Sequence, residues 1–279
     1  MHVGISYFVT DQSMRPDDVA RIVEEVGFES LWFPEHTHIP VSRESSYPRG
    51  GPLPDHYRRT LDQLVALTAA ASATRRIRLG TGVCLIAEHD PINLAKQIAT
   101  LDYMSEGRVE FGVGAGWNRE EMANHGVAFA DRWRVMDERI DALRVLWTEE
   151  TPEYHGDFVD FDPIWMWPKP VQKPHPPILL GLNGPSALQR VLALRADWMP
   201  NEAGSIERIP LLQQMASQVG VDPVRITTWV RSYSAEELDS FAARGVTRSI
   251  LHVPVDSREA QLARIAEYAK MAEPWLTNG

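Results

Sequence analysis

Two side chains that can transfer protons, Glu35 and His36, directly follow a short apolar segment, Ser30–Phe33. An imidazole can donate, accept or hold a proton near neutral pH, and its charge responds to neighbouring groups. If Ser30–Phe33 is a strand, the pair lies at its carboxyl end, where barrel enzymes concentrate their catalytic residues. The pair is therefore a candidate acid–base centre. Two ordinary loop residues bonded to backbone are the alternative interpretation.

A metal centre is a second possible chemistry for this segment, because His36, His38 and the preceding glutamate all carry ligand atoms. No third histidine or aspartate follows nearby, and the later predicted strand ends offer only His252, Asp256 and Asp197. A metal hydrolase needs a more complete set of ligands at these ends. We therefore predict no metal site.

The segment 77–118 organises the rest of the chain, because it reads as strand, helix and strand with short connections. The first extended run, 77–83, ends in glycines, and Asp90 and Pro91 then supply an N-cap and a first helical residue. The second extended run, 108–113, also ends in glycines. Such a unit makes its two strands parallel. Both glycine-rich ends then lie where α/β folds bind ligands.

Strand and helix patterns alternate along the whole chain, and eight such pairs fit into its 279 residues. This count predicts an α/β fold, a (β/α)8 TIM barrel in one domain, 1–279. A doubly wound sheet is the alternative, but its dinucleotide fingerprint follows the first strand, whereas the glycines at 112–116 follow the fourth. Two segments interrupt the alternation: a long loop at 39–56 and an irregular insertion at 151–177, before strand five.

Side-chain alternation along the third and fourth strands places Arg78 and Glu110 inside the barrel, near its floor. A buried charge needs a partner, so we predict that these two residues pair with each other or with a charge in the same layer. The glycines above them should leave the upper barrel open for a flat ligand. The turn 181–186 is either a phosphate site or an ordinary strand–helix turn. The aromatic run 165–167 either covers a ligand or packs the insertion onto the barrel.

Composition narrows the class of protein. Hydrophobic residues make up 44% of the chain, which is typical of globular proteins. The formal charge of −10 argues against nucleic-acid and anionic-membrane partners. The single cysteine, Cys84, excludes an internal disulfide and is read as a small buried hydrophobe. Neither a signal-peptide pattern nor a membrane-length apolar run is present, so we expect a soluble cytoplasmic protein.

Three stretches carry a family resemblance: IRLGTGV, DPINLAKQIATLDYMSEGR with VEFGVGAGWNREE, and FPEHTHIP after the second predicted strand. Together they resemble the luciferase-like monooxygenase superfamily, and most closely its coenzyme F-420 (deazaflavin)-dependent oxidoreductase branch. The resemblance follows the chain in order from the first strand to the last helix. It implies a (β/α)8 barrel that binds F-420, or alternatively FMN, across the carboxyl ends of its strands.

The resemblance also implies roles for particular residues. His36 would act at the edge of the cofactor ring, and Glu35 would tune its charge. A bulge with a cis peptide, at Gly82-Val83 or Val83-Cys84, would back the ring. The remaining turns would hold the cofactor, so the implied cofactor-binding residues are Gly82, Val83, Cys84, Gly114, Gly116, Trp117, Asn118, Gly181, Asn183 and Gly184.

The implied reaction is hydride transfer between F-420 and a small organic substrate, with the loops 39–56 and 151–177 shaping the substrate pocket. Relatives that oxidise glucose-6-phosphate carry a glutamate where this chain has Trp117, so a sugar phosphate is not expected. An FMN-dependent monooxygenase, which would need a partner reductase, and a non-catalytic flavin-binding protein are the alternatives. The family often forms homodimers, and we expect the same here. The substrate should be hydrophobic or aromatic.

Overall fold

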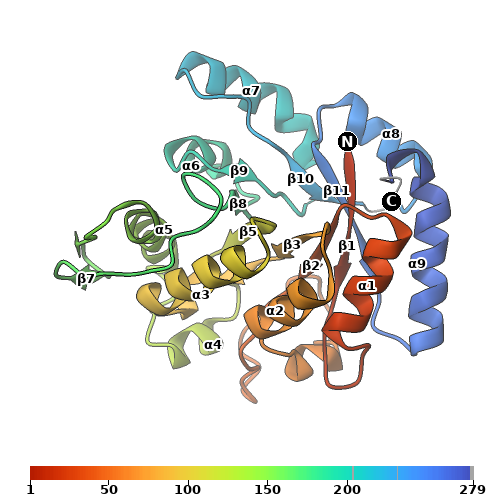
Figure 1. The fold of residues 1–279 in the computed structure, drawn as a ribbon, viewed down its shortest axis with the longest axis horizontal. Helices are drawn as coiled ribbons and strands as arrows, with labels where there is room; N and C mark the ends of the chain where they lie inside the picture. The colour runs from red at the N-terminus through yellow and green to blue at the C-terminus, as the bar shows by residue number, and fades with distance from the viewer. Residues whose placement is uncertain (203, 231, 277–279) are drawn as a thin grey trace.

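The computed structural model describes residues 1–202, 204–230 and 232–276, and its centre is a barrel of parallel strands (Figure 1). The barrel strands are β1 (His2–Tyr7), β2 (Ser30–Phe33), β3 (Arg78–Thr81), β5 (Val109–Gly114), β8 (Ile178–Leu180), β9 (Asp197–Trp198), β10 (Thr227–Trp229) and β11 (Arg248–Val253). They pair in the order β10-β11-β1-β2-β3-β5-β8-β9, and a parallel bridge between Trp198 and Ile226 joins the two ends. The described residues therefore form the nearly closed eight-stranded barrel that the sequence predicts.

Helices alternate with these strands and surround the barrel (Figure 1). They are α1 (Pro16–Val26), α2 (Gln63–Ala73), α3 (Pro91–Met104), α4 (Arg119–Asn124), α5 (Arg132–Thr148), α6 (Ala187–Ala193), α7 (Ile209–Gln218), α8 (Ala235–Ala243) and α9 (Arg258–Ala272). The Asp90 side chain caps α3 by accepting from the Asn93 amide, and Pro91 is its first residue, as predicted. The Ser234 side chain caps α8 in the same way.

Some element boundaries differ from the sequence prediction. The cap of α9 is Ser257, whose hydroxyl accepts from the Ala260 amide, and not Asp256. The helix after the fifth barrel strand begins at Ala187 rather than at Pro185. The predicted seventh strand, 224–230, narrows to β10, because only Thr227–Trp229 pairs with β11. Short additions complete the fold: β4 (Cys84–Leu85), which pairs with β5, and an antiparallel hairpin of β6 (Tyr154–His155) and β7 (Asp160–Phe161).

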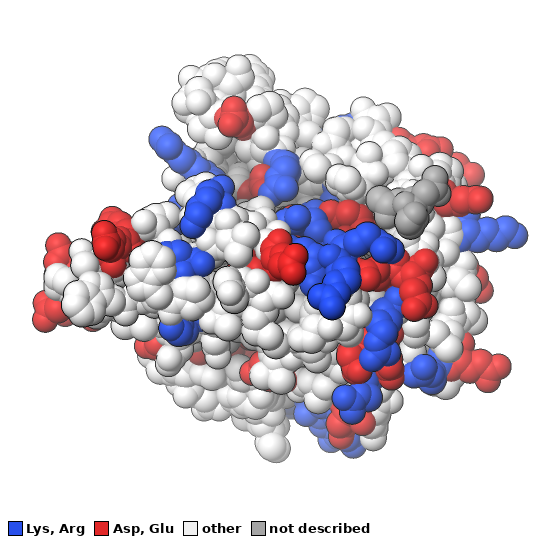
Figure 2. All heavy atoms as spheres, viewed as in Figure 1, with Lys and Arg blue, Asp and Glu red and all other residues white. Residues whose placement is uncertain are grey.

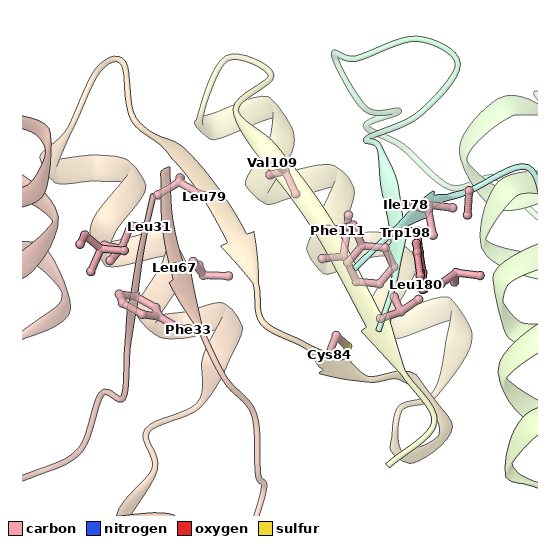
Figure 3. Close-up of a cluster of buried hydrophobic side chains, with 14 of the residues drawn as sticks. Leu31, Phe33, Leu67, Leu79, Cys84, Val109, Phe111, Ile178, Leu180 and Trp198 are labelled. Atoms are coloured by element: carbon pink, nitrogen blue, oxygen red, sulfur yellow. The ribbon is translucent and has the colours of Figure 1, made fainter. Parts of the chain in front are cut away.

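The main hydrophobic core lies between the barrel strands and the helices. Leu31 and Phe33 of β2, Leu79 of β3 and Phe111 of β5 point outward from their strands and are fully buried (Figure 3). Parallel strands that are covered on both faces are expected to be apolar on both. Leu67 of α2 packs in the same cluster, so the helices bury the outer face of the barrel.

The inside of the barrel is filled where an open space was predicted. A Cβ atom on Gly80 would lie 2.1 Å from the Trp32 ring, and one on Gly112 would lie 3.0 Å from the Met199 sulfur. Trp32 and Met199 are fully buried. The prediction of an open barrel above the floor charges is therefore wrong at these two glycines: the Trp32 ring occupies the space beside Gly80, and the Thr81 carbonyl and the Met199 sulfur occupy the space beside Gly112.

The floor of the barrel holds the predicted charge pair. The Arg78 Nε donates to Glu110 Oε1 at 2.5 Å, which confirms the pairing. Arg248 of β11 also reaches this layer, with its Nη2 2.7 Å from Glu29 Oε1 and 3.3 Å from Glu110 Oε1. Glu110 is fully buried, so these guanidinium groups compensate its charge inside the barrel.

The insertion at 151–177 lies on the flank of the barrel, and its hairpin projects away from the strands at the left of Figure 1. Trp165 and Trp167 are 81% and 57% exposed, so neither packs onto the barrel wall. Gln172 anchors the end of the insertion by donating to the Asp102 carboxylate and the Val109 carbonyl. The insertion is thus tied to the outer helix α3 and to the start of β5.

The surface carries charges of both signs. On the face drawn in Figure 2, basic and acidic side chains are interspersed, and groups of blue atoms are flanked by red ones. The described residues include no helix that is both long enough and apolar enough to cross a membrane.

Candidate active site

A cavity of about 420 Å³ lies at the carboxyl end of the barrel, where the sequence placed its candidate residues. Every barrel strand, or the turn that follows it, contributes to the wall, and the loop between β2 and α2 covers it. The lining residues are Ser6, Phe8, Pro34, Glu35, His36, Tyr47, Pro48, Arg49, Pro54, His56, Tyr57, Gly82, Val83, Leu85, Trp117, Gly181, Met199, Asn201, Trp229 and His252.

The bulge after β3 forms one wall of this cavity. The peptide bond between Gly82 and Val83 is cis, as the family resemblance implied. The Val83 side chain lies against two other strand ends, because a Cβ atom on Gly114 or Gly181 would be 2.8 Å from one of its methyl carbons. Glycine at these two positions therefore makes room for Val83, which places the bulge in the cavity wall.

His36 is held by a carboxylate from another part of the chain. Its Nδ1 is 2.7 Å from Glu121 Oε2, and the two side chains are 6% and 0% exposed. The second Glu121 oxygen accepts from the Thr37 amide at 3.1 Å, which fixes the carboxylate beside the histidine. An ionised carboxylate only accepts, so Nδ1 carries the hydrogen of this bond. The opposite ring nitrogen, Nε2, is then the one available to a ligand.

Aromatic rings surround His36 and limit its contact with water. The Tyr57 ring centroid is 5.3 Å from the His36 ring centroid, and the Trp117 centroid is 5.7 Å away in an edge-on arrangement. Tyr47 contacts both of these rings, at 5.4 and 6.3 Å between centroids. These four residues, His36, Tyr47, Tyr57 and Trp117, are named here the aromatic collar.

The hydrogen bonds of Glu35 go to other residues than His36, the residue whose charge it was expected to tune. Successive side chains on extended backbone point to opposite sides, and Glu35 turns to the bulge. It accepts from the Leu85 amide, and its Oε1 is 2.8 Å from His89 Nε2. Burial alone would raise the pKa of Glu35, but the bonds to His89 and Leu85 outweigh it and hold that pKa below its usual value. Glu35 therefore supports the bulge as a carboxylate.

The sequence reasoning missed both partners. In the sequence, the spacing of Asn118 and Glu121 indicates a helix-capping pair, and the Asn118 side chain does accept from the Glu121 amide at 3.2 Å. The cap uses the Glu121 amide, whereas the His36 contact uses the Glu121 carboxylate. The spacing of Asn118 and Glu121 indicates the cap but gives no sign of the contact with His36. His89 carried no pattern of its own, because its partner Glu35 lies 54 residues earlier.

A further acid, Glu88, is buried close to Glu35 and Glu121. Neither of its carboxyl oxygens has a hydrogen-bond partner among the described residues, and the His125 Nε2 lies 3.9 Å from Oε2. Burial raises the pKa of Glu88 to about 9, and the negative charges of Glu121 and Glu35 add to the shift. Glu88 is therefore protonated at neutral pH.

The implied cofactor residues divide into two groups. Gly82, Val83, Trp117 and Gly181 line the cavity. The others contribute no lining atoms: Cys84, Gly114, Gly116, Asn118, Asn183 and Gly184.

Several of these second-group residues have structural partners. Asn118 caps α4. Asn183 exchanges side-chain hydrogen bonds with Asn201, which does line the cavity. The Arg208 guanidinium donates to the carbonyls of Asn183 and Gly184, so the turn 181–186 is held by its carbonyl groups.

Cys84 belongs to a compact group with Glu35 and His89, whose ligand atoms all lie within 4.8 Å of one another. Burial, reinforced by the Glu35 charge, raises the pKa of the Cys84 thiol, so it is not ionised as a metal ligand requires. Both Glu35 oxygens are already bonded to His89 and to the Leu85 amide. His38 is bonded to Thr37 and Asn124 and not to this group. We therefore assign no metal to these residues.

Only one of the two loops that were expected to shape the substrate pocket does so. The β2–α2 loop supplies Tyr47, Pro48, Arg49 and Pro54 to the cavity wall. The insertion at 151–177 supplies no lining residue, which corrects that part of the expectation. The insertion follows α5 and leads into the start of β8, so it lies toward the opposite end of the barrel.

Comparison with known proteins gives the family. A model of the luciferase-like monooxygenase family matches residues 15–275. An uncharacterized protein of Mycobacterium tuberculosis is 43% identical over 98% of this chain and 99% of its own length. An FMNH(2)-dependent dimethylsulfone monooxygenase of Pseudomonas putida is 30% identical over 76% of this chain and 54% of its own length.

Solved structures show the same fold at lower identity. The monooxygenase RslO1 of Streptomyces bottropensis superposes with a TM-score of 0.83 at 21% identity, over 98% of this chain and 99% of that one. An F420-dependent secondary alcohol dehydrogenase, solved with an F420-acetone adduct, gives a TM-score of 0.75 at 18% identity, over 99% and 100%. The family model, which covers most of the sequence, decides the classification: this chain belongs to the luciferase-like monooxygenase family.

Proposed function

We propose that this protein is a deazaflavin-dependent oxidoreductase that transfers a hydride between coenzyme F-420 and a small organic substrate. One observation carries the proposal: the cavity has the bulge at Gly82–Val83 on one side and a carboxylate-held histidine, His36, on another. A flat redox ring needs a firm backing, and a substrate oxygen needs a proton donor or acceptor beside it.

The lining suits such a ring. A volume of about 420 Å³ falls within the usual range of about 300–1,000 Å³ for small-molecule sites. Val83, Met199 and Trp229 offer apolar contacts to a planar face, whereas Asn201 offers hydrogen bonds to a polar edge. Arg49 is the cation of the wall and would favour an anionic part of the cofactor or substrate.

The bound deazaflavin would supply the hydride chemistry, and the chain's own residues would do the rest. His36 Nε2 would take the proton from a substrate hydroxyl during oxidation and return it during reduction. Glu121 would stabilise the imidazolium formed in that step and hold the ring in place. The collar ring Trp117 would keep water away from the reacting atoms.

His252 lies on the wall from β11 and has a different role. Burial lowers the pKa of His252 to about 4, and the positive charge of Arg49 adds to the shift. A histidine that stays neutral at physiological pH would serve the ligand as a hydrogen-bonding group and not as a cation. His36, which has a carboxylate partner, is therefore the better candidate for holding the transferred proton.

FMN-dependent oxygenation is the second candidate, and the resemblance to the dimethylsulfone monooxygenase favours it. The two cofactors share a tricyclic ring, so the cavity would receive either. Purified protein should be titrated separately with F-420 and with FMN while the fluorescence of each is followed. Tight binding of F-420 alone supports the proposal. Tight binding of FMN alone contradicts it, and binding of neither removes both candidates.

Loss of the His36 imidazole should separate catalysis from cofactor binding. For His36→Ala we expect kcat to fall by about 100- to 10,000-fold, the usual contribution of general acid–base catalysis. The affinity for the cofactor, measured by the same fluorescence titration, should change little. His155→Ala, on the exposed hairpin, is the control and should keep full activity. Full activity of His36→Ala would remove His36 from the mechanism.

A further inference from the structure

A second hollow adjoins the cavity and belongs entirely to the β2–α2 loop (residues 39–58). Its volume is about 800 Å³, and all of its lining residues come from this loop. Tyr47 and Pro54 line both hollows, so the two spaces lie next to each other on either side of these residues. We name this second hollow the outer groove.

The outer groove has an apolar wall. Its hydrophobic lining residues come from both ends of the loop: Ile39, Pro40, Val41, Pro52, Leu53 and Pro54. Val41 is 98% exposed and Leu53 is partly buried, so apolar surface faces the groove without a covering partner. Burial of such surface by a ligand is favourable in proportion to its area.

One unpaired positive charge lies beside this wall. The loop carries Arg43, Arg49 and Arg58 against Glu44 and Asp55, in a chain whose formal charge is −10. Arg58 is paired with Asp55. Arg43 lines the groove and makes no ion pair among the described residues.

The loop is also anchored so that the groove keeps its position. Ser45 is buried, and its amide donates to Glu120 Oε1 at 2.9 Å. The Ser45 hydroxyl donates to the other Glu120 oxygen and accepts from the Arg119 amide at 2.9 Å. The middle of the loop is thus fixed to the first turn of α4, the helix that also carries the His36 partner Glu121.

We propose that the outer groove binds the body of an elongated substrate, with an apolar chain along the loop and an anionic end at Arg43. This rests on the proposed function, since the oxygen-bearing carbon of the same molecule would lie in the inner cavity beside His36. The adjacency of the two hollows, the apolar lining and the unpaired arginine together favour a medium-chain hydroxy or oxo carboxylate over a small alcohol. The substrate class is therefore an acyl-like anion.

Calorimetry with simple probes tests this without any turnover. Straight-chain carboxylates from hexanoate to decanoate are titrated into the purified chain without cofactor, and the primary alcohols of equal length are titrated in parallel. Each methylene that enters the groove should tighten Kd by about fourfold, which corresponds to about 0.8 kcal/mol per buried CH2. Carboxylates should bind more tightly than the matched alcohols. A Kd that does not depend on chain length overturns the proposal.

Two variants locate the two ends of the probe. Leu53→Asp should reduce the dependence of Kd on chain length, whereas Leu211→Asp, at an exposed leucine of α7, should leave it unchanged. Arg43→Gln should weaken the carboxylates about tenfold and the alcohols hardly at all, with Arg264→Gln on α9 as its control. Equal effects of either variant and its control would show that the probe binds elsewhere.

The F-420 titration of the same variants separates the two proposals. If the cofactor binds but the probes show no chain-length dependence, the groove proposal fails and the proposed function stands. If the probes behave as expected but neither cofactor binds, the groove is a site for acyl-like anions and the proposed function fails.

Discussion

His36 owes its orientation to Glu121, a residue 85 positions further along the chain. The contact joins the end of β2 to the first turn of α4, and both side chains are almost completely buried. Because one ring nitrogen is committed to the carboxylate, the ring presents its other nitrogen to the cavity in a fixed direction. Glu121 is thus a positioning residue.

Replacing the charge of Glu121 while keeping its shape tests this role. Glu121→Gln should lower kcat by about 10- to 100-fold, because the amide stabilises the imidazolium less than a carboxylate does. KM should change little, so that the loss appears in kcat. Glu25→Gln, at an exposed position of α1, is the matched control. An unchanged kcat with a raised KM would contradict the positioning role of Glu121.

Glu88 gives the protein a pH-dependent stability. Its folded-state pKa is raised to about 9, so between about pH 4.5 and pH 9 the folded chain keeps a proton that the unfolded chain loses. The contribution of Glu88 to the free energy of unfolding is therefore most favourable at low pH and is lost as the pH rises through that window. Glu88→Gln keeps a neutral side chain at every pH, so it should be more stable than the parent at pH 8, by about 5 kcal/mol.

Urea unfolding at pH 4.5 and pH 8 checks the Glu88 prediction. The difference between Glu88→Gln and the parent should be large at pH 8 and nearly absent at pH 4.5. Equal differences at the two pH values would mean that the carboxyl is not protonated in the folded chain.

At the scale of elements, the packing of β3 against β2 depends on Gly80, because the absence of a side chain there leaves room for the Trp32 ring. An alanine at Gly80 would place its Cβ 2.1 Å from the fully buried Trp32 ring. Gly80→Ala should therefore cost about 1–3 kcal/mol or more in unfolding free energy, the usual penalty for overpacking. Gly184→Ala meets no atom within 4 Å and should change stability by no more than about 0.5 kcal/mol. Urea denaturation of both variants measures the contrast, and equal stabilities would contradict the filled interior.

The elements themselves follow from local signals in the sequence. The apolar runs of β2 and β11 were placed at their observed bounds, and the caps at Asp90 and Ser234 were recognised from short-range chemistry. The charge pair between Arg78 and Glu110 followed from side-chain alternation along two strands. Periodicity and capping act over a few residues, so one sequence is enough to read them.

The candidate site was less predictable, because its contacts join residues that are far apart in the chain. The positions of Glu35 and His36 were visible at a strand end, but their partners His89 and Glu121 depend on how the barrel brings segments together. The direction of the insertion at 151–177 was not readable either, since proline and aromatic content marks a loop without showing which end of the barrel it covers. The local sequence pattern was therefore enough to predict where the site lies, but the partner of each residue became clear only from the tertiary contacts.

In the whole molecule, the buried charges that contribute to stability and the hollows that could bind a ligand lie at opposite ends of the barrel. The floor carries buried charges, whereas the opposite end carries the cavity, the collar and the outer groove. Barrel enzymes place their ligand sites at the carboxyl ends of the strands, and the amino end then serves mainly stability. In this chain the Arg248 side chain of β11 forms ion pairs with two carboxylates at the floor: Glu29, which precedes β2, and Glu110 of β5.

Removing that guanidinium should destabilise the whole barrel. Arg248→Met leaves Glu29 and Glu110 buried with fewer compensating charges, and the loss of one partner from a buried ionic group costs about 3–5 kcal/mol. Arg248 is 4% exposed, so water cannot replace it. Arg21→Met, which removes an exposed ion pair with Asp17 on α1, should cost no more than about 1 kcal/mol. Urea unfolding of the two variants measures the difference; a similar small loss in both would show that the other arginines at Glu110, Arg78 and Arg225, are sufficient to hold the strands together.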